Sequence, residues 1–285
     1  MARQLRIQFE GALYHIISRG NERMMIFLEE ADRIKYLKIL HKTIERFNWL
    51  CHVYCLMGNH YHLMIETPNA NLAKGMKYLN QIYSQVFNWK YNRVGHLFQD
   101  RYKSYIVQKE AYLLHCCRYI VLNPWEAKLV EHPEEWKWSS YGATAGLSKP
   151  TPFLTTDWLL DIFGNNVKRA RKNYVKFIES DMEGKRSKLE YKYQIVLGTD
   201  EFAESILKRY GPFSSMKGIN NTQLGFGRPS LNEIFNGKKS PKDERNQSIL
   251  IAYRGILGVR AGIWQYSCTQ QVYYTHPMAV GNDLA

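Results

Sequence analysis

The sequence lacks long apolar runs, a signal-peptide core and a disulfide framework. No window of its 285 residues approaches the roughly 20 consecutive apolar residues that a transmembrane helix needs. Residues 1–7 have none of the apolar character of a secretory signal peptide. The five cysteines are odd in number, and a chain of this length does not need disulfides to fold. These absences argue against membrane and secreted classes and predict a cytoplasmic protein with no membrane partner.

Acidic residues are also few compared with basic ones. There are 26 Asp and Glu against 39 Lys and Arg, which gives a formal net charge of +13. Such an excess does not determine a fold, but it predicts polyanionic partners such as nucleic acid. The chain has 20 Tyr, 12 Phe and 7 Trp residues. Aromatic rings between Lys and Arg suit the unstacked bases of single strands, although most of these rings are expected in the core.

The first 122 residues alternate between strand-like and helix-like hydrophobic patterns. The expected strands are 12–19, 49–57, 61–67 and 98–107, and the expected helices are 29–47, 71–91 and 110–122. Gly58 and Asn59 separate two strands and predict a hairpin, whereas Asn71 is a suitable N-cap and Pro124 ends a helix. This order predicts an α+β fold, a ferredoxin-like antiparallel sheet covered by helices.

The rest of the chain predicts a mostly helical C-terminal extension. We divide the chain into a domain at 1–145, a linker and charged helix at 146–195, and a small helical module at 196–285. Residues 125–141 suggest a short helix followed by a loop, and 167–192 and 199–210 have helical patterns. Within the module, 224–237 and 247–257 resemble helical pieces of a DNA-binding unit, and 262–285 is expected to be an irregular tail.

A metal-binding pattern lies in the strand that follows the expected hairpin turn. His60 and His62 point to the same face because side chains alternate along a strand. Two neighbouring imidazoles can bind one divalent ion, although such pairs also occur in cores or at the surface. If 110–122 is helical, Tyr119 and Asn123 lie one turn apart on one face. A metal pair, a tyrosine and an amide in a basic chain together indicate phosphodiester chemistry with tyrosine as nucleophile.

The strand at 98–107 is expected to lie near the substrate. We expect Arg101 and Lys103 to contact phosphates, and Tyr102 or Tyr105 to stack on a base. Strand alternation predicts that one of these two tyrosines is a core residue instead. With Tyr112, both are also rivals of Tyr119 for the role of nucleophile, and the amide one turn after Tyr119 favours Tyr119.

Three further polar residues flank the expected site. Arg19 and Asn21, at the end of the first strand, would contact DNA or support the site. Arg118, beside the nucleophile, would lower the pKa of Tyr119 and contact DNA, or face solvent.

Five segments in this order resemble a known family. They are YHIISRGN (14–21), MGNHYH (57–62), RYKS (101–104), CRYIVLNP (117–124) and WSSY (138–141). Together they resemble the REP-associated tyrosine transposases, within the single-tyrosine HUH transposases of insertion sequences. The resemblance spans about residues 5–145, and the helical C-terminal region is similar to the extra segment of longer members.

The resemblance implies a specific activity and site. It implies His60, His62 and the Asn123 amide as ligands of Mg²⁺ or Mn²⁺, and Tyr119 as the nucleophile. It also implies a protein, homodimeric or monomeric, that acts on single-stranded or hairpin DNA. Cleavage and rejoining through a 5′-phosphotyrosine would then support DNA transposition and recombination.

Three other interpretations remain open. The chain could be a non-catalytic, sequence-specific DNA-binding regulator derived from a transposase, or an RNA-binding module that uses the basic aromatic strand. Alternatively, a structural zinc site could draw its ligands from Cys51, His52, Cys55, His60 and His62, although no regular ligand spacing is present.

Overall fold

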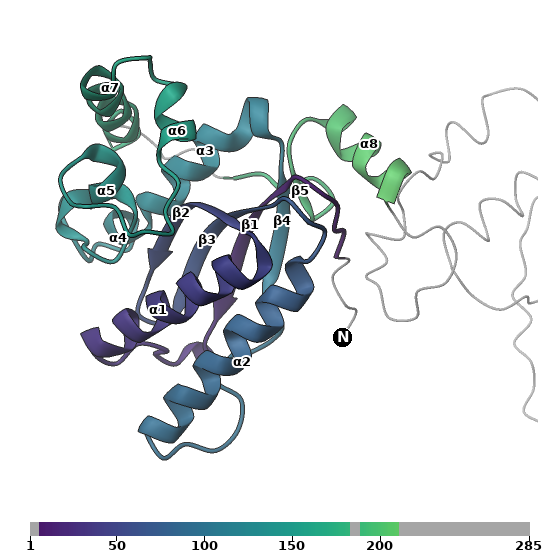
Figure 1. Ribbon diagram of the computed structural model, residues 1–285, viewed down its shortest axis with the longest axis vertical. Helices are drawn as coiled ribbons and strands as arrows, with labels where there is room; N and C mark the ends of the chain where they lie inside the picture. Colours follow the sequence, from purple (N-terminus) through teal and green to yellow (C-terminus); the bar gives the residue numbers. More distant parts are fainter. Residues whose placement is uncertain (1–5, 183–188, 211–285) are drawn as a thin grey trace, which may run out of the picture. The chain divides into compact units, whose positions relative to one another are not determined.

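The computed structural model describes residues 6–182 and 189–210, and these form a mixed five-stranded sheet with helices (Figure 1). The strands are β1 (Ala12–Arg19), β2 (Leu50–Leu56), β3 (His60–Thr67), β4 (Lys103–Val107) and β5 (Val196–Leu197). The sheet order is β2-β3-β1-β4-β5, and the first four strands pair antiparallel. With one helix after β1 and one after β3, this order confirms the predicted ferredoxin-like α+β fold.

Helices occupy the connections and the region that follows the sheet. The helices are α1 (Glu30–Phe47), α2 (Leu72–Lys90), α3 (Lys109–Val121), α4 (Asn123–Glu126), α5 (Tyr141–Ala145), α6 (Asp157–Asp161), α7 (Val167–Glu179) and α8 (Asp200–Tyr210). Short 3₁₀ turns lie at Asn21–Arg23 and Pro133–Glu135. Figure 1 shows α1 and α2 side by side across one face of the sheet.

Strand alternation gives the sheet two separate apolar faces. One face of β1 and β3 packs in a core with α1 and α2, and it carries Tyr14, Ile16, Tyr61 and Leu63. The other face packs in a second core with α3, α5, α6 and α7, and it carries Leu13 and Met64. The two predicted histidines alternate with Tyr61 and Leu63, so they belong to the α3 face.

The turn before β3 is the predicted hairpin. Met57 N donates to His60 O at 2.9 Å across Gly58 and Asn59. A Cβ atom at Gly58 would come within 2.4 Å of Met25 Cε, the flexible end of an exposed side chain that would have to move. The bond from Met57 N to His60 O closes the turn at the point where β3, and hence His60, begins.

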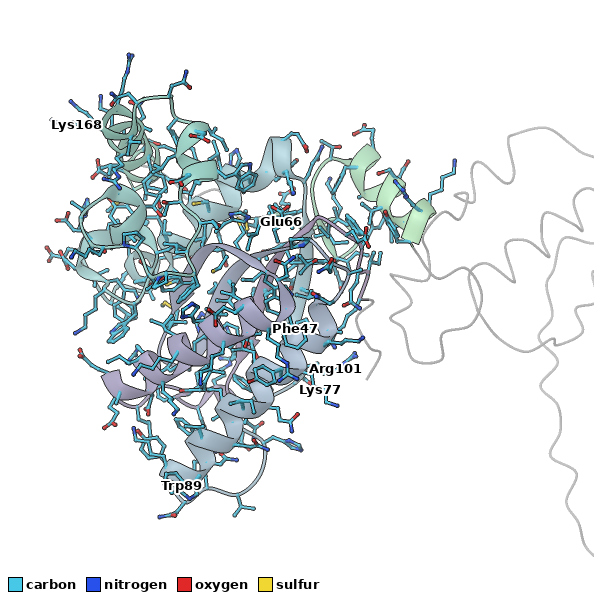
Figure 2. The ribbon with its side chains drawn as sticks, viewed as in Figure 1. Phe47, Glu66, Lys77, Trp89, Arg101 and Lys168 are labelled. Atoms are coloured by element: carbon cyan, nitrogen blue, oxygen red, sulfur yellow. The ribbon has the colours of Figure 1, made fainter. Side chains whose placement is uncertain are left out.

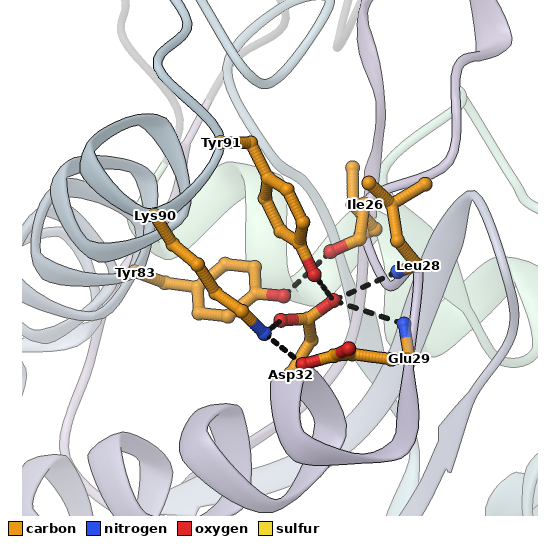
Figure 3. A network of polar contacts seen from close by, with 7 residues as sticks. All are labelled: Ile26, Leu28, Glu29, Asp32, Tyr83, Lys90 and Tyr91. Atoms are coloured by element: carbon orange, nitrogen blue, oxygen red, sulfur yellow. Dashed lines mark hydrogen bonds and ion pairs between the residues drawn. The ribbon is translucent and has the colours of Figure 1, made fainter.

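A polar network joins α1 to the end of α2 (Figure 3). Asp32 Oδ2 accepts hydrogen bonds from the backbone N–H groups of Leu28 and Glu29 and from the Tyr91 hydroxyl at 2.8–3.1 Å. Its Oδ1 pairs with Lys90 Nζ at 2.6 Å, and Lys90 also pairs with Glu29. Burial raises the pKa of Asp32, but these bonds outweigh it, so the pKa lies below its ordinary value.

Several elements differ from the sequence-based prediction. The strand expected at 98–107 begins only at Lys103, because the preceding loop instead bridges Gly20 through Phe98. The short helix expected at the start of 125–141 is the end of α4, and the loop expected after it contains a 3₁₀ turn at Pro133–Glu135. The helix expected at 167–192 ends at Glu179. Asn71 precedes α2 without a capping bond, because its side chain bonds Trp49 Nε1 and Phe47 O.

β5 was not predicted. It pairs parallel with the end of β4, so residues 196–197, expected to begin the C-terminal module, belong to the sheet. The expected helical pieces at 224–237 and 247–257 and the tail at 262–285 lie outside the described residues. Among the residues that the structure describes, no helix has the length and apolarity needed to cross a bilayer.

Candidate metal and tyrosine site

The two predicted histidines lie next to each other at the start of β3. Their ring centroids are 5.0 Å apart, with the ring planes at 75°. His62 is only 3% exposed, whereas His60 is half-buried at the strand end. Strand alternation has therefore placed both rings on the α3 face, within reach of a shared ligand.

One ring nitrogen of His60 is held by the hairpin turn. Nδ1 lies 2.6 Å from the amide oxygen of Asn59. Because this oxygen can only accept, His60 donates from Nδ1 and carries its lone pair on Nε2. Burial, and then the positive charge of Arg19, lower the pKa of His60 to about 4. A neutral imidazole with an oriented lone pair is what a metal ligand requires.

Tyr119 lies against the same rings. Its ring centroid is 5.9 Å from that of His62, and the two planes meet edge to face at 74°. α3 delivers Tyr119 because its buried residues, including Cys116 and Ile120, pack on this face of the sheet. The structure therefore brings the predicted nucleophile and a predicted metal ligand into contact.

His15 is a third histidine of the site, and the sequence analysis missed it. It is fully buried on β1, and its Nε2 lies 2.9 Å from His62 Nδ1. Its Nδ1 lies 2.8 Å from the Tyr191 hydroxyl, and burial lowers its pKa to about 3. The sequence feature that could have indicated His15 was a histidine within an otherwise apolar strand. Its proximity to His62 depends on strand register, which the sequence does not give.

Asn123 follows α3 as predicted, one turn after Tyr119, and is buried. Its Nδ2 donates to Tyr119 O at 2.8 Å and to Ile120 O at 3.3 Å. These bonds hold the end of α3 and the backbone of Tyr119. The role of the Asn123 amide oxygen as a third ligand stays a prediction.

Two exposed basic residues lie beside the histidines. Arg19 on β1 lies directly opposite His60 on β3. Ile17 on β1 lies opposite both His62 on β3 and Lys103 on β4, so Lys103 is on the same face of the sheet as His62. Both side chains are exposed. Their position suits contacts to a phosphate chain that approaches the site.

Three other predicted DNA-contacting residues, Tyr102, Tyr105 and Arg118, make internal contacts. Tyr102 is 6% exposed and packs under the Arg6 guanidinium at 4.0 Å, whereas Tyr105 stacks on Tyr191 at a centroid distance of 3.9 Å. Arg118 bonds Phe177 O at 3.3 Å and pairs with Asp181, so it joins α3 to α7. Only one of the two tyrosines was expected to be packed.

A groove of about 690 Å³ lies between α2 and the loop before β4. Its lining includes Arg6, Lys77 and Arg101, together with the aromatic rings of Phe98 and Tyr102. Figure 2 shows Lys77 and Arg101 on the same side of the domain. The loop that forms one wall of the groove is held to the end of β1, because Gln99 N donates to Arg19 O and Asn21 N to Leu97 O.

The structural zinc alternative is wrong. A bulge between Cys51 and Val53 shifts β2, so Cys51 faces the α1 and α2 core and Cys55 faces the other core. His52 instead contacts Glu66 at 3.2 Å and Thr155 at 2.9 Å. Within the described part of the chain, no group of three or more His, Cys, Asp or Glu side chains could hold a metal ion.

Comparisons with known proteins give one family and a similar structure. Residues 8–123 match the family described as "Transposase IS200 like". No curated protein matches the chain. Among solved structures, "Structure of the REP associates tyrosine transposase bound to a REP hairpin" aligns at 13% identity and a TM-score of 0.46. The alignment covers 59% of this chain and 93% of that chain.

Proposed function

Since residues 8–123 match the family of IS200-like transposases, we propose that the chain cleaves and rejoins single-stranded DNA beside hairpins with Tyr119 as nucleophile. One observation carries the proposal: the Tyr119 ring packs 5.9 Å from the ring of His62, with His60 next to it. A phenol and two imidazoles on one wall of a basic domain suit attack on a phosphodiester.

Tyr119 would act by transesterification. Its phenol oxygen attacks phosphorus, the bond to the 3′ oxygen breaks, and the phenol proton passes through solvent to that oxygen. The products are a 5′-phosphotyrosine and a free 3′-OH. Attack by another 3′-OH on the phosphotyrosine restores the DNA and the phenol, so the cycle needs no external energy source.

The ring nitrogens fit a divalent cation. His60 and His62, with the amide oxygen of Asn123 as third ligand, would hold Mg²⁺ or Mn²⁺ and leave other positions for phosphate and water. When bound, the ion polarises the phosphate and offsets charge that builds up during attack. The Asn59 contact supports this role because it keeps the His60 lone pair on Nε2.

The surrounding charge would guide the DNA. Arg19 and Lys103 lie beside the histidines, and Arg101 lines the groove, one wall of which is hydrogen-bonded to Arg19. We propose that these side chains contact phosphates. Asn21 and Arg118 would support the site indirectly. The backbone N–H of Asn21 donates to Leu97 O in the loop at the groove, and Arg118 holds α3 against α7.

A covalent adduct tests the proposal. The full chain is incubated with Mn²⁺ and labelled single-stranded oligonucleotides that carry hairpins from its flanking genome. We expect a labelled protein band on a denaturing gel. Tyr119→Phe should abolish this band and leave hairpin binding intact, whereas Tyr112→Phe, on the same helix, should retain it.

Two results would contradict the proposal. An adduct that persists in Tyr119→Phe would reassign the nucleophile. Hairpin binding without any adduct, with Mg²⁺ or Mn²⁺, would favour the alternative of a non-catalytic DNA-binding regulator.

A further inference from the structure

A chain of polar contacts runs from Tyr191 through His15 to His62. The Tyr191 hydroxyl lies 2.8 Å from His15 Nδ1, and His15 Nε2 lies 2.9 Å from His62 Nδ1. We propose that His15 and Tyr191 are positioning residues that hold His62 in the tautomer and orientation required to bind a divalent cation. This inference rests on the proposed function.

The direction of the protons follows from the ligand role of His62. To bind a cation through Nε2, His62 must carry its proton on Nδ1, so its partner must accept. His15 Nε2 can accept only if the His15 proton is on Nδ1, and that proton then points at the Tyr191 oxygen. The opposite direction would place a proton on His15 Nε2 and on His62 Nε2, which prevents ligation. The Tyr191 hydroxyl oxygen therefore acts as the acceptor that keeps the His15 proton on Nδ1.

His15 is placed to orient His62 and not to bind the cation itself. It contacts the Nδ1 side of the His62 ring, opposite to Nε2. On β1 it lies between Met64 of β3 and Tyr105 of β4, with no exposed surface. The rings of Tyr105 and Tyr119 lie 6.0 and 5.9 Å from its ring. This packing prevents the ring from turning, so its two nitrogens keep their partners.

Tyr191 comes from outside the residues that match the transposase family. It lies beyond residue 123, and its ring stacks on Tyr105 at 3.9 Å. The segment is held by the bond from Lys192 N to Val196 O at 2.7 Å and by the pairing of β5 with β4. The region after the matched residues thus supplies a side chain to the site, which a domain ending near residue 145 would lack.

The tautomers can be read without any metal. The full chain is labelled with ¹⁵N at its nine histidines, and long-range ¹H–¹⁵N spectra assign the protonated nitrogen of each ring. We expect Nδ1–H at both His15 and His62. In Tyr191→Phe the His15 signal should shift towards the Nε2–H form. A proton on Nε2 of His62 in the wild-type chain would overturn the proposal.

Metal affinity gives the second readout, measured with Mn²⁺ alone by electron paramagnetic resonance on the full chain. His15→Met keeps the volume but removes the acceptor, and it should weaken Mn²⁺ binding about 10- to 100-fold. His15→Gln, whose amide oxygen can accept in place of Nε2, should restore most of the affinity. Tyr191→Phe should cause a smaller loss, and Tyr78→Phe, on α2, should cause none.

The outcomes separate this inference from the proposed function. If His60→Ala and His62→Ala abolish Mn²⁺ binding while His15→Met and Tyr191→Phe retain it, the positioning role is wrong and the ligand role stands. If the wild-type chain binds no Mn²⁺ and forms no adduct, the proposed function fails, and the tautomer of His62 alone decides this inference. If His15→Met does not fold, Tyr191→Phe and the spectra decide it.

Discussion

His60 and His62 are held in different ways although they share one strand. His60 is fixed by Asn59, which also donates through Nδ2 to Arg23 O at 3.0 Å and so ties the ring to the turn. His62 is fixed from inside the sheet by His15. One proposed ligand thus depends on a surface turn and the other on the buried core, so damage to either region should weaken binding of the cation.

At the scale of the residue, we predict that both histidines are needed for cleavage. His60→Ala or His62→Ala removes a proposed ligand of the cation, and the cation stabilises the transition state by several kcal/mol. Adduct formation should therefore fall by more than about 100-fold, and added Mn²⁺ should not fully restore it. The measurement is the rate of adduct formation on a denaturing gel. His41→Ala, a half-buried histidine on α1, is the control. Full activity in the double variant would dismiss the metal role.

At the scale of the element, Asp32 is the main polar link between α1 and α2. Asp32→Asn removes a charged acceptor from Lys90 and from two backbone N–H groups, so it should lower the free energy of unfolding by about 2 kcal/mol. Because the folded pKa is lowered, the contribution is present above the ordinary carboxyl pKa and is lost as pH falls through the folded value.

Urea unfolding at pH 7 and at pH 3 measures this difference. The gap between wild type and Asp32→Asn should be smaller at pH 3. Glu45→Gln removes an exposed carboxylate from the same helix and should change stability by less than about 0.5 kcal/mol. A gap that is equal at both pH values would mean that the charge of Asp32 does not carry the link.

The elements also show how far the sequence could be read. The alternating periods and the Gly58–Asn59 turn predicted the strand and helix order, since each depends on local residues. The bulge between Cys51 and Val53 and the two-residue strand β5 leave no periodic signal, so both were missed. For the same reason the sequence could pair Tyr119 with Asn123 along one helix, but could not pair His15 with His62 across two strands.

At the scale of the whole molecule, the positive charge has two candidate places on the described domain. One is the groove with Lys77 and Arg101. The other is a hollow along α7 that includes Lys168, Arg171 and Lys172. Figure 2 shows Lys168 on a different part of the domain from Lys77 and Arg101. Only the groove has a wall that is hydrogen-bonded to Arg19, which pairs with His60.

We therefore predict that the groove, and not α7, binds the DNA on which Tyr119 acts. Lys77→Glu and Arg101→Glu should each weaken hairpin binding several-fold across unrelated sequences. Each should also reduce the magnitude of the slope of log affinity against log salt concentration by about one, which corresponds to one phosphate contact. Lys168→Glu makes the same change in charge and should have little effect. Fluorescence anisotropy at several salt concentrations, with the adduct rate at saturating DNA, measures both. If Lys168→Glu reduces the salt slope and the groove variants do not, the strand follows α7, and the hydrogen bond from Gln99 to Arg19 serves only to hold the loop.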